Sequence, residues 1–124
     1  MNRSYILVIV LVLIVGLIAA FHITSSSQTE TQAQPQSKVF DLVVANRKLI
    51  SGPSVLMVKQ NDPVTINITV DEGEELHLHG YNLHVDLEKG KPGSLSFVAS
   101  SSGRFPYELE HSSTEIGALE VDPQ

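Results

Sequence analysis

The sequence contains no cysteine. It therefore offers no disulfide, no thiolate nucleophile and no thiolate metal ligand, and every site that depends on cysteine sulfur is excluded. Charge is also scarce, since Asp, Glu, Lys and Arg make up 18% of the chain, and the formal net charge is -6 at pH 7. Because nucleic acid and anionic lipid surfaces attract basic proteins, both are poor candidate partners for this chain.

The motifs of common hydrolases and nucleotide-binding enzymes are missing as well. The sequence has no Gly-x-Ser-x-Gly, no His-Glu-x-x-His and no Gly-rich phosphate loop. Serine, aspartate and histidine are present, but none falls at the spacing of a recognised catalytic set. We therefore expect a binding or interaction protein and not an enzyme.

One long apolar run is present near the N-terminus, from Tyr5 to Phe21. It is apolar on every face, so it does not fit the surface of a soluble domain. As a helix at about 1.5 Å per residue it spans roughly 25 Å, and His22 and Ile23 extend it into the interface. We predict a single transmembrane anchor over residues 5–23.

The orientation of this anchor follows from the charge that precedes it. Arg3 is the only charged residue on the N-terminal side, which favours residues 1–4 in the cytoplasm and export of the rest. The expected location is the cell membrane, crossed once, with the C-terminal domain on the periplasmic or other extracytoplasmic side. A cleaved signal peptide is the alternative, although Ile18 before Ala19-Ala20 makes a poor cleavage site.

The rest of the chain divides into a linker and a β domain. Residues 24–37 hold Ser, Thr, Gln, Glu and Pro with almost nothing to bury, which predicts a flexible linker. Over residues 38–124 apolar side chains alternate with polar ones, most clearly in Val64–Val70, and helical periodicity is absent. This pattern predicts an all-β domain, an antiparallel β-sandwich or barrel. The expected strands cover residues 39–44, 55–58, 64–70, 76–78, 83–87, 94–98, 104–109 and 116–121.

Three of the five histidines lie within eight residues, at His77, His79 and His84. On a strand, residues two apart share a face, so His77 and His79 point the same way, opposite the neighbouring leucines. His84 shares its face with Asp86 and Glu88 and is interpreted as solvated. Neighbouring neutral imidazoles are the usual ligands of copper, zinc or iron, whereas a single exposed histidine is most simply a surface residue.

Three landmarks in the β domain resemble the cupredoxins, small exported Greek-key β-sandwiches, over residues 38–122. His79-Gly80-Tyr81 is similar to the His-Gly-aromatic step that holds the first copper-binding histidine of the family. Gly103–Tyr107 is similar to the strand that leads into the ligand loop. His111 and the segment Ile116–Val121 are similar to the loop histidine and the final strand. The sequence is similar in particular to EfeO-type cupredoxin-like domains and to the copper domain of cytochrome oxidase subunit II.

Two departures from the family change what the resemblance implies. Leu109 stands at the position of the cysteine ligand and Ile116 at the position of the axial methionine. A blue (type 1) or binuclear purple copper centre is therefore not expected, because both need thiolate sulfur. Only His79 and His111 carry over as ligand positions, and we expect them side by side. The candidate third ligands, which with imidazole suit Cu(II), Zn(II) or Fe better than Cu(I), are His77, Glu108, Glu110 and Glu115.

These expectations lead to two functions of different kinds. In the first, an exported, membrane-anchored domain binds copper or another transition metal through histidines, or passes it to a neighbouring metal-transport system. In the second, the domain has lost its metal and serves as an interaction or accessory domain of a membrane complex for respiration or metal uptake. Neither function involves nucleic acid.

Overall fold

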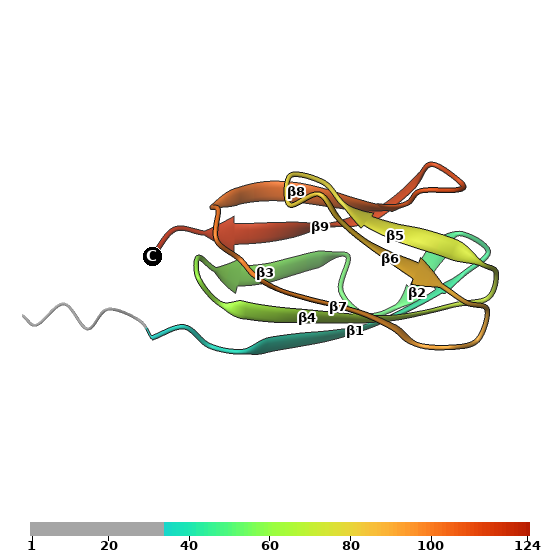
Figure 1. Cartoon of the computed structure of the whole chain (residues 1–124), viewed down its shortest axis with the longest axis horizontal. Coiled ribbons are helices and arrows are strands. Elements are labelled where there is room, and N and C mark those ends of the chain that lie inside the picture. Colours follow the sequence, from blue (N-terminus) through green and yellow to red (C-terminus); the bar gives the residue numbers. More distant parts are fainter. Residues whose placement is uncertain (1–33) are drawn as a thin grey trace, which may run out of the picture. The chain divides into compact units, whose positions relative to one another are not determined.

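The computed structural model describes residues 34–124, which form two β-sheets packed face to face (Figure 1). All regular elements in this part of the chain are strands, which confirms the all-β class. Among the described residues no helix is long and apolar enough to cross a membrane. The expected cytoplasmic residues 1–4, the anchor over residues 5–23 and the linker as far as residue 33 lie outside the described residues.

Nine strands are present in residues 34–124, four in the first sheet and five in the second. The order in the first sheet is β2 (Lys48–Ser51), β1 (Lys38–Ala45), β4 (Pro63–Val70) and β7 (Gly93–Val98). The order in the second sheet is β3 (Val55–Lys59), β9 (Thr114–Asp122), β8 (Gly103–Leu109), β5 (Glu74–Leu78) and β6 (Leu83–Leu87).

The expectation of a purely antiparallel sandwich is wrong for two strand pairs. β1 runs parallel to β4, and β3 runs parallel to β9, so both sheets are mixed. Alternation of apolar and polar residues identifies the buried face of a strand but carries no information on its direction. The Greek-key part of the expectation fits, because β5, β6 and β7 are successive neighbours and β4 pairs with β7.

The core lies between the two sheets and follows the alternation in the sequence. Val64, Ile66, Ile68 and Val70 are each at most 2% exposed, and they form the centre of the first sheet. The second sheet contributes inward-facing side chains of its own, including Leu56, Leu76, Leu78, Tyr107 and Leu119. Burial raises the pKa of Tyr107 to about 12, because its phenolate would lack water.

The short strand β2 is the one element that the sequence did not predict. It pairs with β1 through a two-residue turn at Asn46 and Arg47, whose φ values of 51° and 60° are both positive. Turns of this kind usually carry glycine at the second position, and Arg47 gives no such signal. The turn is held from outside, because Asn46 N–H donates to Asp71 and Arg47 Nε donates to Glu72.

The first described residues and the C-terminus lie at one end of the sandwich. Gln36 N–H donates to the buried carboxylate of Asp62 at 2.7 Å, and Gln60 N–H donates to the carbonyl of Asp122. Burial acts to raise the pKa of Asp62, but the N–H groups of Gln36 and Lys59 and the nearby lysines lower it overall. Figure 1 shows the β5–β6 turn at this same end and the β8–β9 loop at the opposite end.

Candidate metal centre

The β5–β6 hairpin sets three imidazole rings in a row on the outer face of the second sheet. Leu76 and Leu78 of β5 point into the core, so His77 points outward. His77 lies opposite His84 of β6, and their rings stack with centroids 4.1 Å apart and planes 12° apart. On its other side the ring of His77 lies 4.2 Å from that of His79, just beyond the end of β5.

Each of these imidazoles contacts a carboxylate. His79 Nε2 lies 2.7 Å from Glu108 Oε1 on β8, and His77 Nδ1 lies 2.9 Å from Glu110 Oε2. His84 Nδ1 lies 2.8 Å from an oxygen of Glu75. The antiparallel pairing of β5 with β8, in which His77 is opposite Glu108, brings Glu108 and Glu110 to the rings, whereas Glu75 lies on β5 itself.

The central histidine is the most enclosed of the row. The side chain of His77 is 14% exposed, compared with 41% for those of His79 and His84. The hydrogen bond from His77 lowers the pKa of Glu110, and this effect outweighs the opposing effect of desolvation. The carboxylate of Glu110 is thus held in its anionic form beside the ring.

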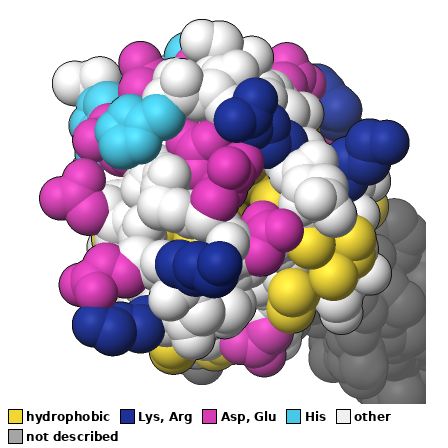
Figure 2. Space-filling model, turned by 90° about the vertical axis from the view of Figure 1, so that its right-hand side faces the viewer, with side chains coloured by type: hydrophobic (Ala, Val, Ile, Leu, Met, Phe, Trp, Pro, Cys, Tyr) yellow, Lys and Arg dark blue, Asp and Glu magenta, His cyan; other side chains and the backbone are white. Residues whose placement is uncertain are grey.

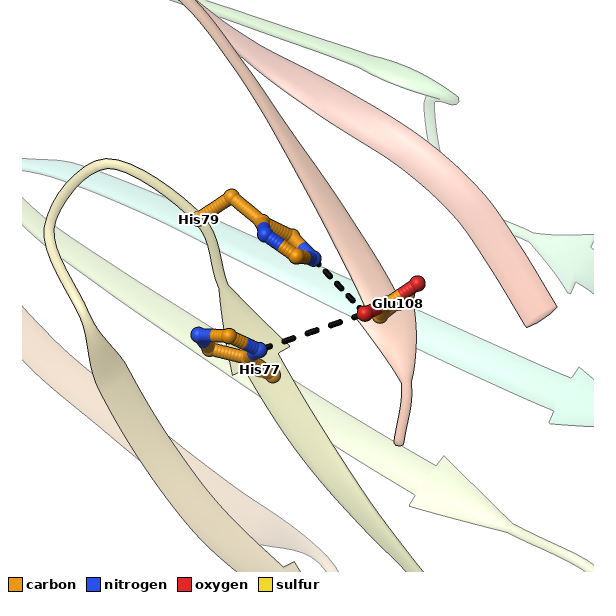
Figure 3. Close-up of side chains that lie close together, drawn as sticks. All are labelled: His77, His79 and Glu108. Atoms are coloured by element: carbon orange, nitrogen blue, oxygen red, sulfur yellow. Dashed lines mark hydrogen bonds and ion pairs between the residues drawn. The ribbon is translucent and has the colours of Figure 1, made fainter. Parts of the chain in front are cut away.

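Three of these side chains could share one metal ion. The donor atoms of His77, His79 and Glu108, one from each, lie within 4.8 Å of one another. Figure 3 shows the two rings beside the carboxylate of Glu108. His77 Nδ1 is 4.0 Å from Glu108 Oε1, whereas donor atoms of one tetrahedral site are about 3.4 Å apart. To share one ion, these two atoms would have to come closer, and His79 Nε2 and Glu108 Oε1, now 2.7 Å apart, would have to separate. Two imidazoles and a carboxylate suit Cu(II), Zn(II) or Fe(II).

The β5–β6 turn fixes where His79 lies. Gly80 has a φ of +78°, and a Cβ at this position would meet the ring of Phe105. Tyr81 packs edge-on against Phe105, and its hydroxyl donates to the carbonyl of Ser101. His79 N–H donates to the carbonyl of Pro106. These contacts join the turn to β8 and hold His79 over Glu108.

His111 lies in the β8–β9 loop and does not join this row. Its Nδ1 is 3.9 Å from Glu74 Oε2, at the first residue of β5, whereas His79 follows the last residue. His79 follows Glu74 by five positions along extended chain, which corresponds to roughly 16 Å. The expected pairing of His79 with His111 is therefore not what the structure shows. Because β8 runs antiparallel to β5, the loop after β8 returns beside the start of β5.

Of the candidate third ligands, His77 belongs to the row of rings, and Glu108 and Glu110 lie beside it. Glu115 lies on β9, opposite Glu108. His84 was interpreted as solvated, yet it stacks on His77. The sequence did carry a signal for this contact. Four residues, His79 to Asn82, join β5 to β6, and a hairpin symmetric about them pairs position 77 with position 84.

No protein-family model matches the sequence, and no curated protein matches it. Solved structures do match. A copper binding protein in the apo form aligns with a TM-score of 0.58 and 13% identity, over 71% of this chain and 97% of that one. Blue copper oxidase from Nitrosomonas europaea aligns with a TM-score of 0.57 and 20% identity, over 72% of this chain and 40% of that one. The periplasmic domain of cytochrome oxidase subunit II from Bradyrhizobium japonicum aligns with a TM-score of 0.55 and 13% identity, over 69% and 84%.

This chain has a cupredoxin fold. The resemblance seen in the sequence is confirmed at the level of the fold, and the chain spans about two fifths of the copper oxidase that it matches. In this cupredoxin fold, Leu109 and Ile116 are 1% and 8% exposed. The positions at which the resemblance places the sulfur ligands are thus filled by buried aliphatic side chains that cannot bind copper.

Proposed function

We propose that this chain is a membrane-anchored, exported domain that binds Cu(II), or another divalent transition metal, through His77, His79 and Glu108. The observation that carries the proposal is the convergence of two imidazoles and one carboxylate on the outer face of β5 and β8. Copper is named first because proteins described as copper-binding share the fold. Without cysteine the domain is not a blue-copper electron carrier, and no enzymatic activity is proposed.

The proposed location rests on the sequence and on one structural likeness. The apolar run over residues 5–23 is long enough for an anchor, and the periplasmic domain of an oxidase subunit shares the fold. An anchor would confine the metal site to a thin layer beside the membrane and raise its effective concentration there. A membrane-bound metal-transport or respiratory complex is therefore the proposed class of partner.

Titration of the full-length protein in detergent with Cu(II) tests the metal site. We expect an EPR spectrum with nitrogen coupling from two imidazoles and no strong absorption near 600 nm, because no thiolate is present. His77→Ala and His79→Ala should each lower the affinity more than roughly 100-fold, since losing even an outer partner of a ligand costs about 10–100-fold. Affinity should also fall as the pH is lowered, because protonated imidazole does not bind metal.

Glu88→Gln is the matched control, because it removes an exposed carboxylate that is paired with Lys91 and is not one of the proposed ligands. It should leave the two-imidazole EPR signal intact. Glu108→Gln should weaken binding while the overall fold, followed by circular dichroism, is retained. Unchanged Cu(II) affinity and an unchanged signal in the double variant His77→Ala/His79→Ala would refute the proposed site.

An interaction domain without metal is the second candidate, and the outer face of β1 and β2 favours it. Val39, Val43 and Ile50 are 59%, 37% and 64% exposed, so this sheet presents apolar side chains to solvent. Such side chains are candidates for contact with a partner. Cross-linking in native membranes should then capture a partner that Val39→Lys/Ile50→Lys loses. Capture of the same proteins by that variant would count against this second candidate.

A further inference from the structure

A buried carboxylate lies at the end of the sandwich opposite the row of histidines. Glu74 is the first residue of β5 and is 4% exposed, although its side chain ends in a carboxyl group. It belongs to the inward-facing positions of the strand, together with Leu76 and Leu78, so its side chain points between the sheets. Among the described residues, its Oε2 atom has no hydrogen-bond partner.

This missing partner is energetically significant. Moving an ionised carboxylate out of water without a counter-charge or a hydrogen-bond donor costs on the order of several kcal/mol of free energy. Buried charges in proteins are accordingly paired or bound to metal ions. Within residues 34–124, Glu74 Oε2 has no hydrogen-bond donor, and the imidazole of His111 comes no closer than 3.9 Å, so a ligand from outside this part of the chain would satisfy it.

The side chain placed beside Glu74 is an imidazole. The β5–β8 pairing sets Leu76 opposite Leu109, and continuing it by two residues sets Glu74 opposite His111. The distance from His111 Nδ1 to Glu74 Oε2 is 3.9 Å, too long for a hydrogen bond. It is close to the separation of about 3.4 Å between two ligands of one tetrahedral metal ion. His111 is 62% exposed in its side chain and therefore free to close the difference.

A second buried polar atom without a hydrogen-bond partner lies in the loop that carries His111. The hydroxyl oxygen of Ser112, next to His111, is buried and makes no hydrogen bond within the described part of the chain. The loop itself is well defined, because Ser113 N–H donates to the carbonyl of Glu110 and Glu110 N–H donates to that of Glu75. Figure 2 looks onto this end of the sandwich and shows acidic side chains spread over it, with Lys and Arg side chains among them.

We propose that Glu74 and His111 bind a second divalent cation, of the Zn(II) or Cu(II) class, at this end of the sandwich. One carboxylate oxygen and one imidazole nitrogen suit these ions, and water completes the coordination in an open site. This second site shares no residue with the site proposed at His77, His79 and Glu108.

The positive charge of Arg47, which interacts with Glu74 through space, does not replace the cation. Arg47 is held by Glu72, with 2.8 Å between Nε and the carboxylate oxygen, on the outside of the β1–β2 turn. The hydrogen bond with Glu72 is the main reason that the pKa of Arg47 is raised, and the charge of Glu74 adds only a smaller effect. Arg47 therefore senses Glu74 through space and leaves its Oε2 without a direct partner.

Zinc binding measured by calorimetry on the metal-free, full-length protein in detergent tests the inference. We expect two sites in the wild type. The His77→Ala/His79→Ala variant should retain the site at Glu74, and adding His111→Ala or Glu74→Gln to it should lower its zinc affinity at least tenfold. Zinc should also raise the thermal midpoint of His77→Ala/His79→Ala, and this rise should vanish when Glu74→Gln is added.

Glu88→Gln is the matched control, because it removes an exposed carboxylate that is paired with Lys91 on the surface. It should leave zinc binding at both sites unchanged. If Glu74→Gln does not fold, the exposed His111→Ala variant still decides the question. The inference would be overturned if neither Glu74→Gln nor His111→Ala changed zinc binding to the His77→Ala/His79→Ala variant. It would also be overturned if the His77→Ala/His79→Ala variant bound no zinc at all. If zinc binding instead depends on Glu74 and His111 but not on His77 and His79, the proposed function fails and this inference stands.

Discussion

At the level of single side chains, the row of imidazoles is held together by carboxylates. Glu75, Glu108 and Glu110 each contact one ring, so the rings have defined positions before any ligand arrives. Two carboxylates lie near His77 Nδ1, that of Glu110 at 2.9 Å and that of Glu108 at 4.0 Å. A metal ion bound through Nδ1 would therefore displace the contact with Glu110.

Replacing Glu110 with Gln should change the stability of the protein in acid. The pKa of Glu110 is lowered in the folded state from 4.5, chiefly by the hydrogen bond with His77. The folded state therefore binds this proton less readily than the unfolded state, and the contact stabilises the fold above about pH 4.5. That contribution is lost as the pH falls through the folded-state pKa.

The Glu110→Gln variant lacks this contribution at every pH. Its thermal midpoint should lie below that of the wild type near pH 6, and the two should converge as the pH approaches 3. Thermal melts followed by circular dichroism across this range measure the difference. A gap of constant size from pH 6 to pH 3 would show that Glu110 does not titrate as its contact with His77 requires.

At the level of elements, the β5–β6 hairpin determines the geometry of the metal site. Its turn contains Gly80 and Asn82, both with positive φ, and Asn82 is a residue type that tolerates this conformation. The turn packs on Phe105 of β8 through Gly80 and Tyr81. The strand that carries Glu108 thus also supports the turn that positions His79.

Gly80→Ala should therefore lower both stability and metal affinity. The new methyl group would meet the ring of Phe105, and alanine disfavours a φ of +78°. We expect a loss of about 1–3 kcal/mol in the free energy of unfolding, measured with urea, together with weaker Cu(II) binding.

Gly90→Ala is the matched control for this change. Gly90 also has a positive φ, of +72°, but a Cβ there meets no atom within 4 Å. The free energy of unfolding of this variant should fall by only about 1 kcal/mol, the cost of a positive φ for alanine, and its Cu(II) affinity should be unchanged. Equal losses of stability in the two variants would show that packing on Phe105 is unimportant.

The elements also show how far the sequence alone could lead. Alternation located eight of the strands, because a buried face repeats every second residue whatever the partner strand. β2 was not predicted because its turn has Arg47 at a position with positive φ, where glycine is usual. The parallel pairs were not predicted because alternation does not depend on strand direction. His79 and His111 were expected together because the landmarks fix their order along the chain but not the end of the sandwich at which each lies.

At the level of the whole molecule, Tyr107 lies in the core between the two sheets. It is 0% exposed, and its hydroxyl reaches the carbonyls of Pro53 and Ser54 only at 3.4 and 3.5 Å. Its ring is thus held by packing, with weak support from hydrogen bonds. Ionisation of this phenol would place a charge in the core.

Stability at high pH should reflect this burial. The pKa of Tyr107 is about 12 in the folded state and about 10 when the chain is unfolded. The folded state holds the proton more tightly, so stability should fall as the pH rises from 10 to 12, by up to about 2–3 kcal/mol. Tyr107→Phe should lack this part of the fall, as urea unfolding at several pH values would show. Parallel pH profiles of the two proteins would contradict the prediction.

The meeting of Gln36, Asp62 and Asp122 at one end of the sandwich has a practical consequence for single-molecule and surface work. A dye, a bead or a sensor chip coupled at the C-terminus sits on the same side as the start of β1. The loop that carries His111 then faces the solution, open to any reagent that flows past. Immobilisation through that terminus therefore suits measurements on the Glu74 end, whereas a coupling point within the β8–β9 loop would block it.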